Sequence, residues 1–167
     1  MSPWLLLHLL YLIPLTFLLW AQLHERAHVW MADHLIGVVY YKISTWPRWY
    51  EGGVRWAHVK YYMVRQPTAP ERFWISMAPR IPSAVGVILA PLGPWFLSGW
   101  LLLVWLTVWG GGVVDLITNS LGLHESTDLR KAARATNTSP WLYRIVGICV
   151  ALSSIGAAVW GMVVELL

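Results

Sequence analysis

Two histidines four residues apart, with a glutamate directly after the first, stand in the segment HERAH at residues 24–28. In a helix, residues i and i+4 lie on nearly the same face, so His24 and His28 can present two imidazole nitrogens to one metal ion. Glu25 is offset by one position, which keeps its carboxylate out of the ligand set but close to it, where it can take a proton from water. The H-E-x-x-H pattern predicts a zinc hydrolase site.

A catalytic zinc ion needs a third protein ligand, and Asp115 is the first candidate. It lies in the apolar segment GGGVVDLITNS, where an acid is costly unless it is paired or bound. Gly110, Gly111 and Gly112 would let this segment approach another helix closely. Asp115 could therefore be the third ligand, and the alternative is that it forms an ion pair with Arg80 or another basic residue.

Two other candidates compete with Asp115. His34 continues the spacing H-E-x-x-H-x-x-G-x-x-H, except that Met31 replaces the glycine. If the helix continued through Met31, His34 would point away from His28, because only a turn at that position could bring it back. A third candidate group consists of loop residues that we interpret as a solvated cluster or a helix cap: His124, Glu125 and Asp128.

The composition is that of an integral membrane protein. Of the 167 residues, 57% are hydrophobic and only 12% are charged, which is too few charges for a soluble domain. The single cysteine excludes an intrachain disulfide and a thiolate metal cluster. The formal charge of +4 is spread over loops without a basic patch, so we expect the partner to be the lipid bilayer and no nucleic acid. The N-terminus lacks the basic region of a removable signal peptide.

Four apolar segments are long enough to cross a bilayer as helices. We therefore predict one α-helical membrane domain, residues 1–167, with spans at about 3–34, 71–92, 95–119 and 141–166. The second span carries Arg80 and three prolines, so we expect a kinked helix whose polar positions face protein rather than lipid.

The two long loops have different characters. Residues 36–65 contain two β-rich runs, 36–45 and 54–64, separated by WPRWYEGG, which predicts a small interfacial β-hairpin. Residues 120–140 form a second loop, in which we expect a short helix from Thr127 to Ala135 capped by Ser126.

The basic residues set the expected orientation in the membrane. The basic residues between the first and second spans are Arg26, Lys42, Arg48, Arg55, Lys60, Arg65 and Arg72, and those between the third and fourth spans are Arg130, Lys131 and Arg134. The N-terminus, the PLGP turn and the C-terminus have no lysine or arginine. Because positive charge is enriched on the cytoplasmic side, we expect both loops and the metal site there and both termini outside, in a prokaryotic inner or plasma membrane.

The combination of these features resembles a known family, the small four-span zincin peptidases of bacteria and archaea, which are similar in plan to site-2 intramembrane metalloproteases. The resemblance rests on HERAH, on the loop segment WAHVK, on SMAPRIP at the second span and on the glycine-rich third span that ends in an aspartate. It implies that His24, His28 and Asp115 bind Zn²⁺ and that Glu25 is the general base.

The leading functional hypothesis is a zinc metalloendopeptidase that cleaves a membrane or membrane-proximal protein or peptide with zinc-activated water. The alternative is a non-catalytic accessory or structural subunit of a larger membrane complex that retains a peptidase-like fold. A di-iron oxidase is a third hypothesis, but such a site needs further histidine motifs, and this chain has no adjacent histidines.

Overall fold

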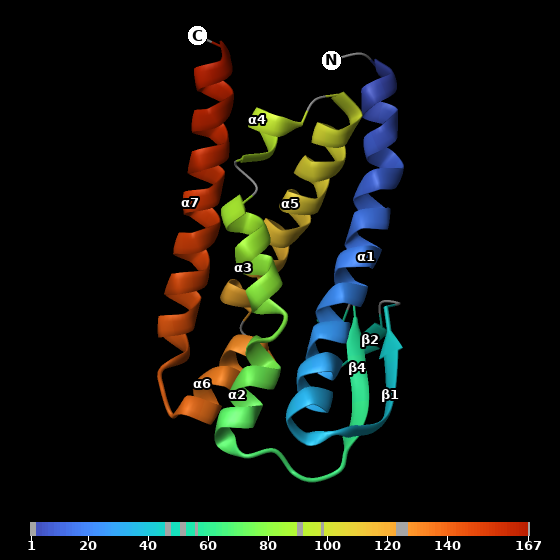
Figure 1. Ribbon diagram of the computed structural model, residues 1–167, viewed down its shortest axis with the longest axis vertical. Helices are drawn as coiled ribbons and strands as arrows, with labels where there is room; N and C mark the ends of the chain where they lie inside the picture. The colour runs from blue at the N-terminus through green and yellow to red at the C-terminus, as the bar shows by residue number, and fades with distance from the viewer. Residues whose placement is uncertain are drawn as a thin grey trace.

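The computed structural model describes residues 3–45, 48–50, 53–55, 57–89, 92–97, 99–122 and 127–166. The fold is mostly helical, with a two-stranded antiparallel hairpin after the first helix (Figure 1). The helices are α1 (Pro3–Ile36), α2 (Ala69–Met77), α3 (Arg80–Leu89), α4 (Gly93–Phe96), α5 (Gly99–Leu121), α6 (Asp128–Thr136) and α7 (Pro140–Leu166). The strands are β1 (Val38–Ser44), β2 (Arg48–Tyr50), β3 (Gly53–Arg55) and β4 (His58–Met63).

The long helices run along the long axis of the molecule. In Figure 1, α1 begins and α7 ends at one end, while the strands, α2 and α6 lie at the opposite end. α5 contacts α1, α3 and α7, so it lies at the centre of the bundle. The mostly helical fold class and the hairpin after the first helix are thus confirmed.

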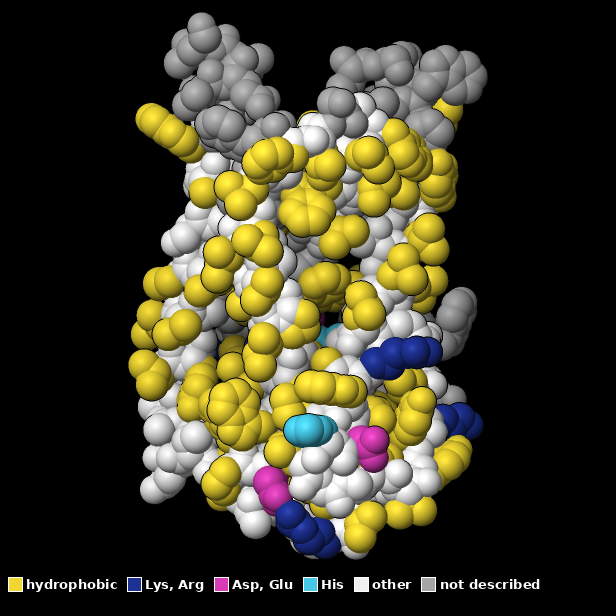
Figure 2. All heavy atoms as spheres, in the orientation of Figure 1, with side chains coloured by type: hydrophobic (Ala, Val, Ile, Leu, Met, Phe, Trp, Pro, Cys, Tyr) yellow, Lys and Arg dark blue, Asp and Glu magenta, His cyan; other side chains and the backbone are white. Residues whose placement is uncertain are grey.

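Two helices of the described chain are long and apolar enough to cross a membrane, namely Gly99–Leu121 and Pro140–Trp160. Hydrophobic side chains cover most of the face drawn in Figure 2, whereas the charged side chains visible there lie toward the end that carries the strands. The length and apolar composition of these two helices support an association with a membrane.

The predicted second span is divided into two helices. α2 ends at Met77 and α3 starts at Arg80, with the break at Ala78 and Pro79. Proline removes a backbone donor and its ring clashes with the preceding turn, which explains the break. The side chain of Arg80 is only 3% exposed, so this polar group faces protein, as predicted.

The strands differ in detail from the two predicted runs. β1 pairs with β4 in antiparallel register, from Val38 opposite Met63 to Ser44 opposite His58. The second predicted run is divided between β3 and β4, and β2 pairs with β3 in a separate ladder. α1 also continues through Ile36, which was predicted to begin a strand. Gly37 then makes the turn into β1 at a φ of 89°.

The core of the bundle lies where α3, α5 and α7 meet. Val87, Val113, Leu116 and Ala151 form its buried cluster. A hydroxyl links all three helices, because Ser154 donates a hydrogen bond to the Val87 carbonyl and accepts one from the Trp109 indole at 2.9 Å. A helix interior in apolar surroundings tolerates such polar groups only when they are paired.

The close helix approach predicted for the glycines at positions 110–112 is present at two of the three. A β-carbon at Gly112 would lie 3.5 Å from the side chains of Trp20 and Val87, so α5 approaches both α1 and α3 closely here. At Gly111 it would lie 3.7 Å from Thr16, whereas at Gly110 it would meet nothing within 4 Å. Close approach therefore depends on Gly112 most of all.

The short helix expected in the second loop is α6. It extends from Asp128 to Thr136, one residue later at each end than predicted, with Thr127 as its N-cap residue. Ser126, the predicted cap, lies outside the described residues. α6 ends at Asn137, which adopts the left-handed conformation at a φ of 52°.

Replacing Gly37 by Ala tests the turn that joins α1 to the hairpin. We expect the substitution to reduce the free energy of unfolding by about 1–2 kcal/mol, because an L side chain is strained at positive φ, and the new methyl would lie 3.1 Å from Val64. Thermal unfolding of the detergent-solubilised protein measures the effect. Gly156→Ala is the control, since a β-carbon there meets nothing within 4 Å. Equal melting temperatures for the two variants would contradict the strained-turn account.

Candidate metal centre

α1 places the HERAH segment with its chemistry-bearing side chains inward. Glu25 and His28 are each 7% exposed, and the side chain of His24 is 13% exposed. Arg26 points to the exterior, so its charge does not enter the site. The imidazole rings of His24 and His28 lie edge to face with their centroids 5.2 Å apart. The predicted sharing of one helix face by the two histidines is therefore present.

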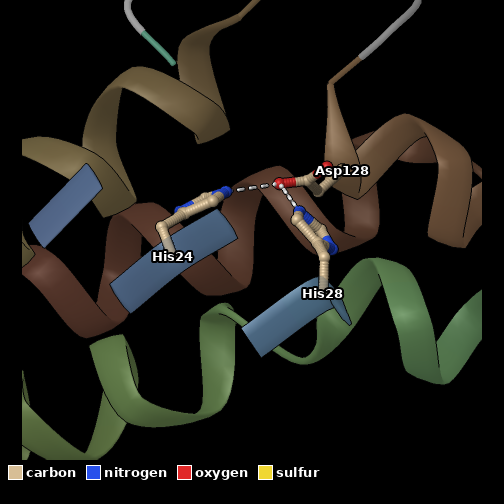
Figure 3. Close-up of side chains that lie close together, drawn as sticks. All are labelled: His24, His28 and Asp128. Atoms are coloured by element: carbon tan, nitrogen blue, oxygen red, sulfur yellow. Dashed lines mark hydrogen bonds and ion pairs between the residues drawn. The ribbon is translucent and has the colours of Figure 1, made fainter. Parts of the chain in front are cut away.

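α6 brings a third group, Asp128, to the two histidines (Figure 3). The helix packs against α2. Its apolar face holds Leu129, Ala132 and Ala133, each at most 3% exposed, and the two alanines are small enough to permit a close approach. Asp128, four residues before Ala132, shares this face and is 6% exposed. The interpretation of Asp128 as a solvated residue is wrong, whereas its place in the first turn of α6 fits the helix-cap alternative.

The three groups are spaced as ligands of one ion would be. Asp128 Oδ2 lies 3.1 Å from His24 Nε2 and 3.4 Å from His28 Nε2. All three ligand atoms lie within 4.8 Å of one another. Two ligands bound tetrahedrally to zinc at 2.0–2.2 Å would be roughly 3.3–3.6 Å apart. The group His24, His28 and Asp128 can hold a metal ion.

The other nitrogen of each imidazole faces an acceptor. His28 Nδ1 lies 2.7 Å from the backbone carbonyl of Ile75 in α2. A carbonyl can only accept, so Nδ1 carries the proton, and the Nε2 of a neutral His28 presents its lone pair to Asp128. His24 Nδ1 lies 3.5 Å from Asp115 Oδ1. Ligating histidines commonly have such a carbonyl or carboxylate behind them, which fixes the orientation of the ring.

Asp115, the predicted third ligand, therefore lies behind His24 rather than beside its Nε2. Its carboxylate is held from several sides: Oδ2 accepts hydrogen bonds from Arg80 at 2.5 Å and from Ser83 at 3.3 Å, and Oδ1 accepts one from Asn119 at 3.1 Å. The ion pair with Arg80, which was the alternative role for Asp115, is present. Its assignment as a metal ligand stays a prediction, and its position suits the support of His24 better.

Arg80 connects the two acids. Its Nη1 binds Asp115, while its Nη2 lies 3.1 Å from Asp128 Oδ2 and 3.1 and 3.2 Å from the two ring nitrogens of His24. Three polar groups thus converge on the single oxygen Asp128 Oδ2, namely the two imidazoles and this guanidinium.

With both imidazoles neutral, the buried charges of the site leave a negative excess. Arg80 forms ion pairs with Asp115 and Asp128, and Glu25 is a third buried carboxyl group on the inward face of α1, so one guanidinium leaves two negative charges when all three acids are ionised. Lys131 lies 3.4 Å from Asp128 Oδ1, but its side chain is half exposed and its charge is screened by solvent.

The ionisation of Asp128 is strongly favoured by its neighbours. Burial alone would raise the pKa of this carboxyl group. When the imidazoles are protonated, the charge of His28, hydrogen bonds from His24 and His28, and the charge of Arg80 outweigh burial and hold the pKa of Asp128 well below its usual value. Asp128 is therefore a carboxylate at neutral pH, the form in which it can bind a cation.

The remaining candidates lie apart from the site or beyond the described chain. α1 stays helical through Met31, and His34 is exposed, with its ring stacked on Trp30 at a centroid distance of 5.8 Å. His124 and Glu125 fall outside the described residues.

Reasoning from the sequence ranked Asp128 too low and did not place Arg80 within the site. One signal was available for Asp128, since the stripe of Leu129, Ala132 and Ala133 marks the buried face of a short helix. The residue that begins such a helix four positions before a buried alanine is expected on the same face.

Comparisons of this chain with protein-family models, with curated proteins and with solved structures give no match.

Metal analysis of the purified protein tests this centre. We expect one divalent ion per chain, and we expect His28→Gln and Asp128→Asn each to weaken its binding by more than about 100-fold, because loss of an outer-shell partner alone costs 10–100-fold. His34→Gln is the matched control on the same helix and should keep the ion. Equal loss in His28→Gln and His34→Gln would place the metal elsewhere.

Proposed function

We propose that this chain is a membrane-embedded zinc metalloendopeptidase of the small zincin peptidase family that its sequence resembles. The observation that carries the proposal is the 3.4 Å contact between His28 Nε2 and Asp128 Oδ2. Because Nδ1 holds the proton of a neutral His28, this contact sets a lone pair against a carboxylate. Two such acceptors remain together only if a cation, either a proton or a metal ion, lies between them.

A divalent metal ion satisfies the site better than protons do. Protonation of both histidines would place two imidazolium rings 5.2 Å apart, beside the Arg80 guanidinium, in a buried environment. One divalent ion would neutralise the two excess negative charges and leave both rings neutral. Two imidazoles and one carboxylate at tetrahedral spacing are the ligands of a catalytic zinc ion, which keeps its fourth position for water or substrate.

We assign the three ligand positions to His24, His28 and Asp128, in place of the Asp115 of our sequence prediction. Asp115 and the Ile75 carbonyl then serve as the acceptors that orient the two rings. Zinc held there would supply a Lewis acid for the scissile carbonyl and would lower the pKa of water to about 7.

Glu25 is the residue best placed to move protons. It follows the first ligand directly, lies on the inward face of α1 and is 7% exposed. Its carboxylate would take a proton from water as the water oxygen attacks the carbonyl carbon. It would deliver that proton to the leaving amine nitrogen as the C–N bond breaks. The buried position protects both transfers from bulk solvent.

The hairpin lies where it could hold a peptide substrate. β4 packs against α1. Burial raises the pKa of Tyr61 in β4, and the charges of Asp128 and Glu25 raise it further, so this strand passes close to the site. A two-stranded sheet leaves edges that can pair with an extended peptide. Because a helical substrate hides its carbonyls in its own hydrogen bonds, the substrate must unwind locally before attack.

An opening in the surface supplies a route to the site. Figure 2 shows a narrow hollow near the middle of the face, and histidine atoms are visible at its base. The partial exposure of the His24 and Asp115 side chains, 13% and 16%, agrees with limited access. We infer that the scissile segment reaches the metal from this side.

Four membrane spans give the chain its orientation in this proposal. α1, the α2–α3 pair, α5 and α7 would cross the bilayer with both termini outside and with the hairpin and α6 in the cytoplasm. The beginning of α1 and the end of α7 lie at the end opposite the hairpin, which agrees with this topology (Figure 1). The peptidase site would then lie at the cytoplasmic side.

Glu25→Gln separates catalysis from metal binding. We expect cleavage of a co-expressed membrane substrate to fall by about 10²–10⁴-fold, the usual contribution of a general base, with metal content unchanged. His28→Gln should lose both substrate cleavage and bound metal, whereas His34→Gln should keep both. Undiminished cleavage by Glu25→Gln would contradict this mechanism. A wild-type protein that holds no metal and co-purifies with a defined complex would favour the accessory-subunit hypothesis.

Cysteine labelling tests the topology. In a Cys149→Ser background, Lys42→Cys marks the exposed face of β1 and Phe96→Cys marks α4, where Phe96 is 82% exposed. A membrane-impermeant maleimide added to intact cells should modify the cysteine at position 96 and spare that at position 42. Both should react after lysis. Labelling of position 42 in intact cells would reverse the proposed orientation.

A further inference from the structure

Arg80 is a buried cation with two unequal anionic partners. Its Nη1 lies 2.5 Å from Asp115 Oδ2, whereas its Nη2 lies 3.1 Å from Asp128 Oδ2. The side chain is only 3% exposed, so water cannot replace either partner. Arg80 therefore divides its hydrogen bonds between an acid behind His24 and an acid in the metal site.

We propose that the Arg80 guanidinium competes with the metal ion for Asp128 and thereby sets the metal affinity. Asp115 binds the guanidinium and holds it back from the metal site, which reduces this competition. This inference rests on the proposed metal centre. Arg80 is thus a positioning residue that acts through Asp128, and Asp115 is its anchor.

The competition follows from the atoms involved. Asp128 Oδ2 is both the acceptor of the Arg80 Nη2 hydrogen bond and the oxygen that faces His24 Nε2 and His28 Nε2. A metal ion bound by this oxygen would share it with a guanidinium of the same sign of charge. Two cations on one buried oxygen repel each other strongly, since little solvent screens them. Metal binding must therefore shift the guanidinium toward its other partner.

Asp115 is built to receive the guanidinium. Its carboxylate is fixed by Ser83 of α3 and Asn119 of α5, in addition to Arg80 itself. The anchor thus belongs to the packed α3–α5 interface rather than to a mobile chain. The shorter ion pair with Asp115 indicates that the guanidinium already prefers this partner.

A specific rescue follows. Asp115→Asn removes the anchor charge, so Arg80 should bind Asp128 alone and reduce metal affinity by at least 100-fold. Adding Arg80→Gln removes the competing cation, and the double variant should bind metal at least tenfold more tightly than Asp115→Asn. The double variant removes both charges of the buried Arg80–Asp115 ion pair, so neither residue is left with a buried charge that lacks its partner.

The experiment uses the full chain in detergent, freed of metal and titrated with Zn²⁺ against a chromophoric chelator. The variants are Asp115→Asn, Arg80→Gln/Asp115→Asn and a control, Arg144→Gln/Asp115→Asn. Arg144 is a buried arginine, 5% exposed, that donates to the Gly122 carbonyl at 2.6 Å. Removing it should not restore metal binding. Circular dichroism and melting temperatures report whether each variant is folded.

If Asp115→Asn does not fold, the comparison is made between Arg80→Gln/Asp115→Asn and Arg80→Lys/Asp115→Asn, which keeps the positive charge. The former should bind Zn²⁺ at least tenfold more tightly. Equal affinities in this pair, no rescue of Asp115→Asn by Arg80→Gln, or wild-type affinity in Asp115→Asn would each overturn the inference. If Asp115 were itself a ligand, its loss could not be rescued at position 80. A wild-type protein that binds no Zn²⁺ defeats the metal centre instead.

Discussion

The structure around the site depends on one buried oxygen, Oδ2 of Asp128. A carboxylate in an environment with little water is stable only when charges and donors of opposite sign surround it. Here the guanidinium of α3 supplies one such charge, and the two imidazoles of α1 supply the rest when they are protonated or share a metal ion with Asp128; all three groups come from parts of the chain far from Asp128 in sequence. The packing of α6 against α2 and the inward face of α1 bring these groups together.

The same requirement explains how the polar groups are distributed. Within the apolar body, several buried polar groups are matched to a partner on another helix or one turn away: His28 with the Ile75 carbonyl, Ser83 with Pro79, and Ser154 with Val87 and Trp109. These hydrogen bonds connect the helices and help to fix their rotation, which hydrophobic packing alone would leave poorly specified. The rings of the two histidines are therefore oriented before any ion binds, which reduces the cost of forming a metal site.

The two acids near His24 illustrate how a fold gives different roles to like groups. Asp115 lies at the Nδ1 side of the ring and is bound by three side chains from α3 and α5. Asp128 lies at the Nε2 side and points at both histidines. Arg80 contacts both, so the charge of the site is shared rather than local. Low polarity strengthens each of these interactions and makes any unpaired charge costly.

The sequence by itself determined the features that depend on short intervals. The spacing of His24 and His28, the offset of Glu25, the helix break at Pro79 and the existence of a hairpin after the first helix all follow from local periodicity and backbone chemistry. These rules act within a few residues and need no knowledge of the rest of the chain. The exclusion of His34 was also a local matter, since it required only that α1 continue past Met31.

Only the tertiary structure decided which acid meets the two imidazoles. Asp115 and Asp128 are both acidic, both follow long apolar segments, and both lie about ninety to one hundred residues from HERAH along the chain. Local patterns allow either acid to be buried, but they do not say which of the two meets the imidazoles. The choice depends on how α6 docks on α2 through its alanine face and on where Arg80 points after the break at Pro79. Helix rotation and docking are set by the sum of many weak contacts, which sequence spacing does not encode.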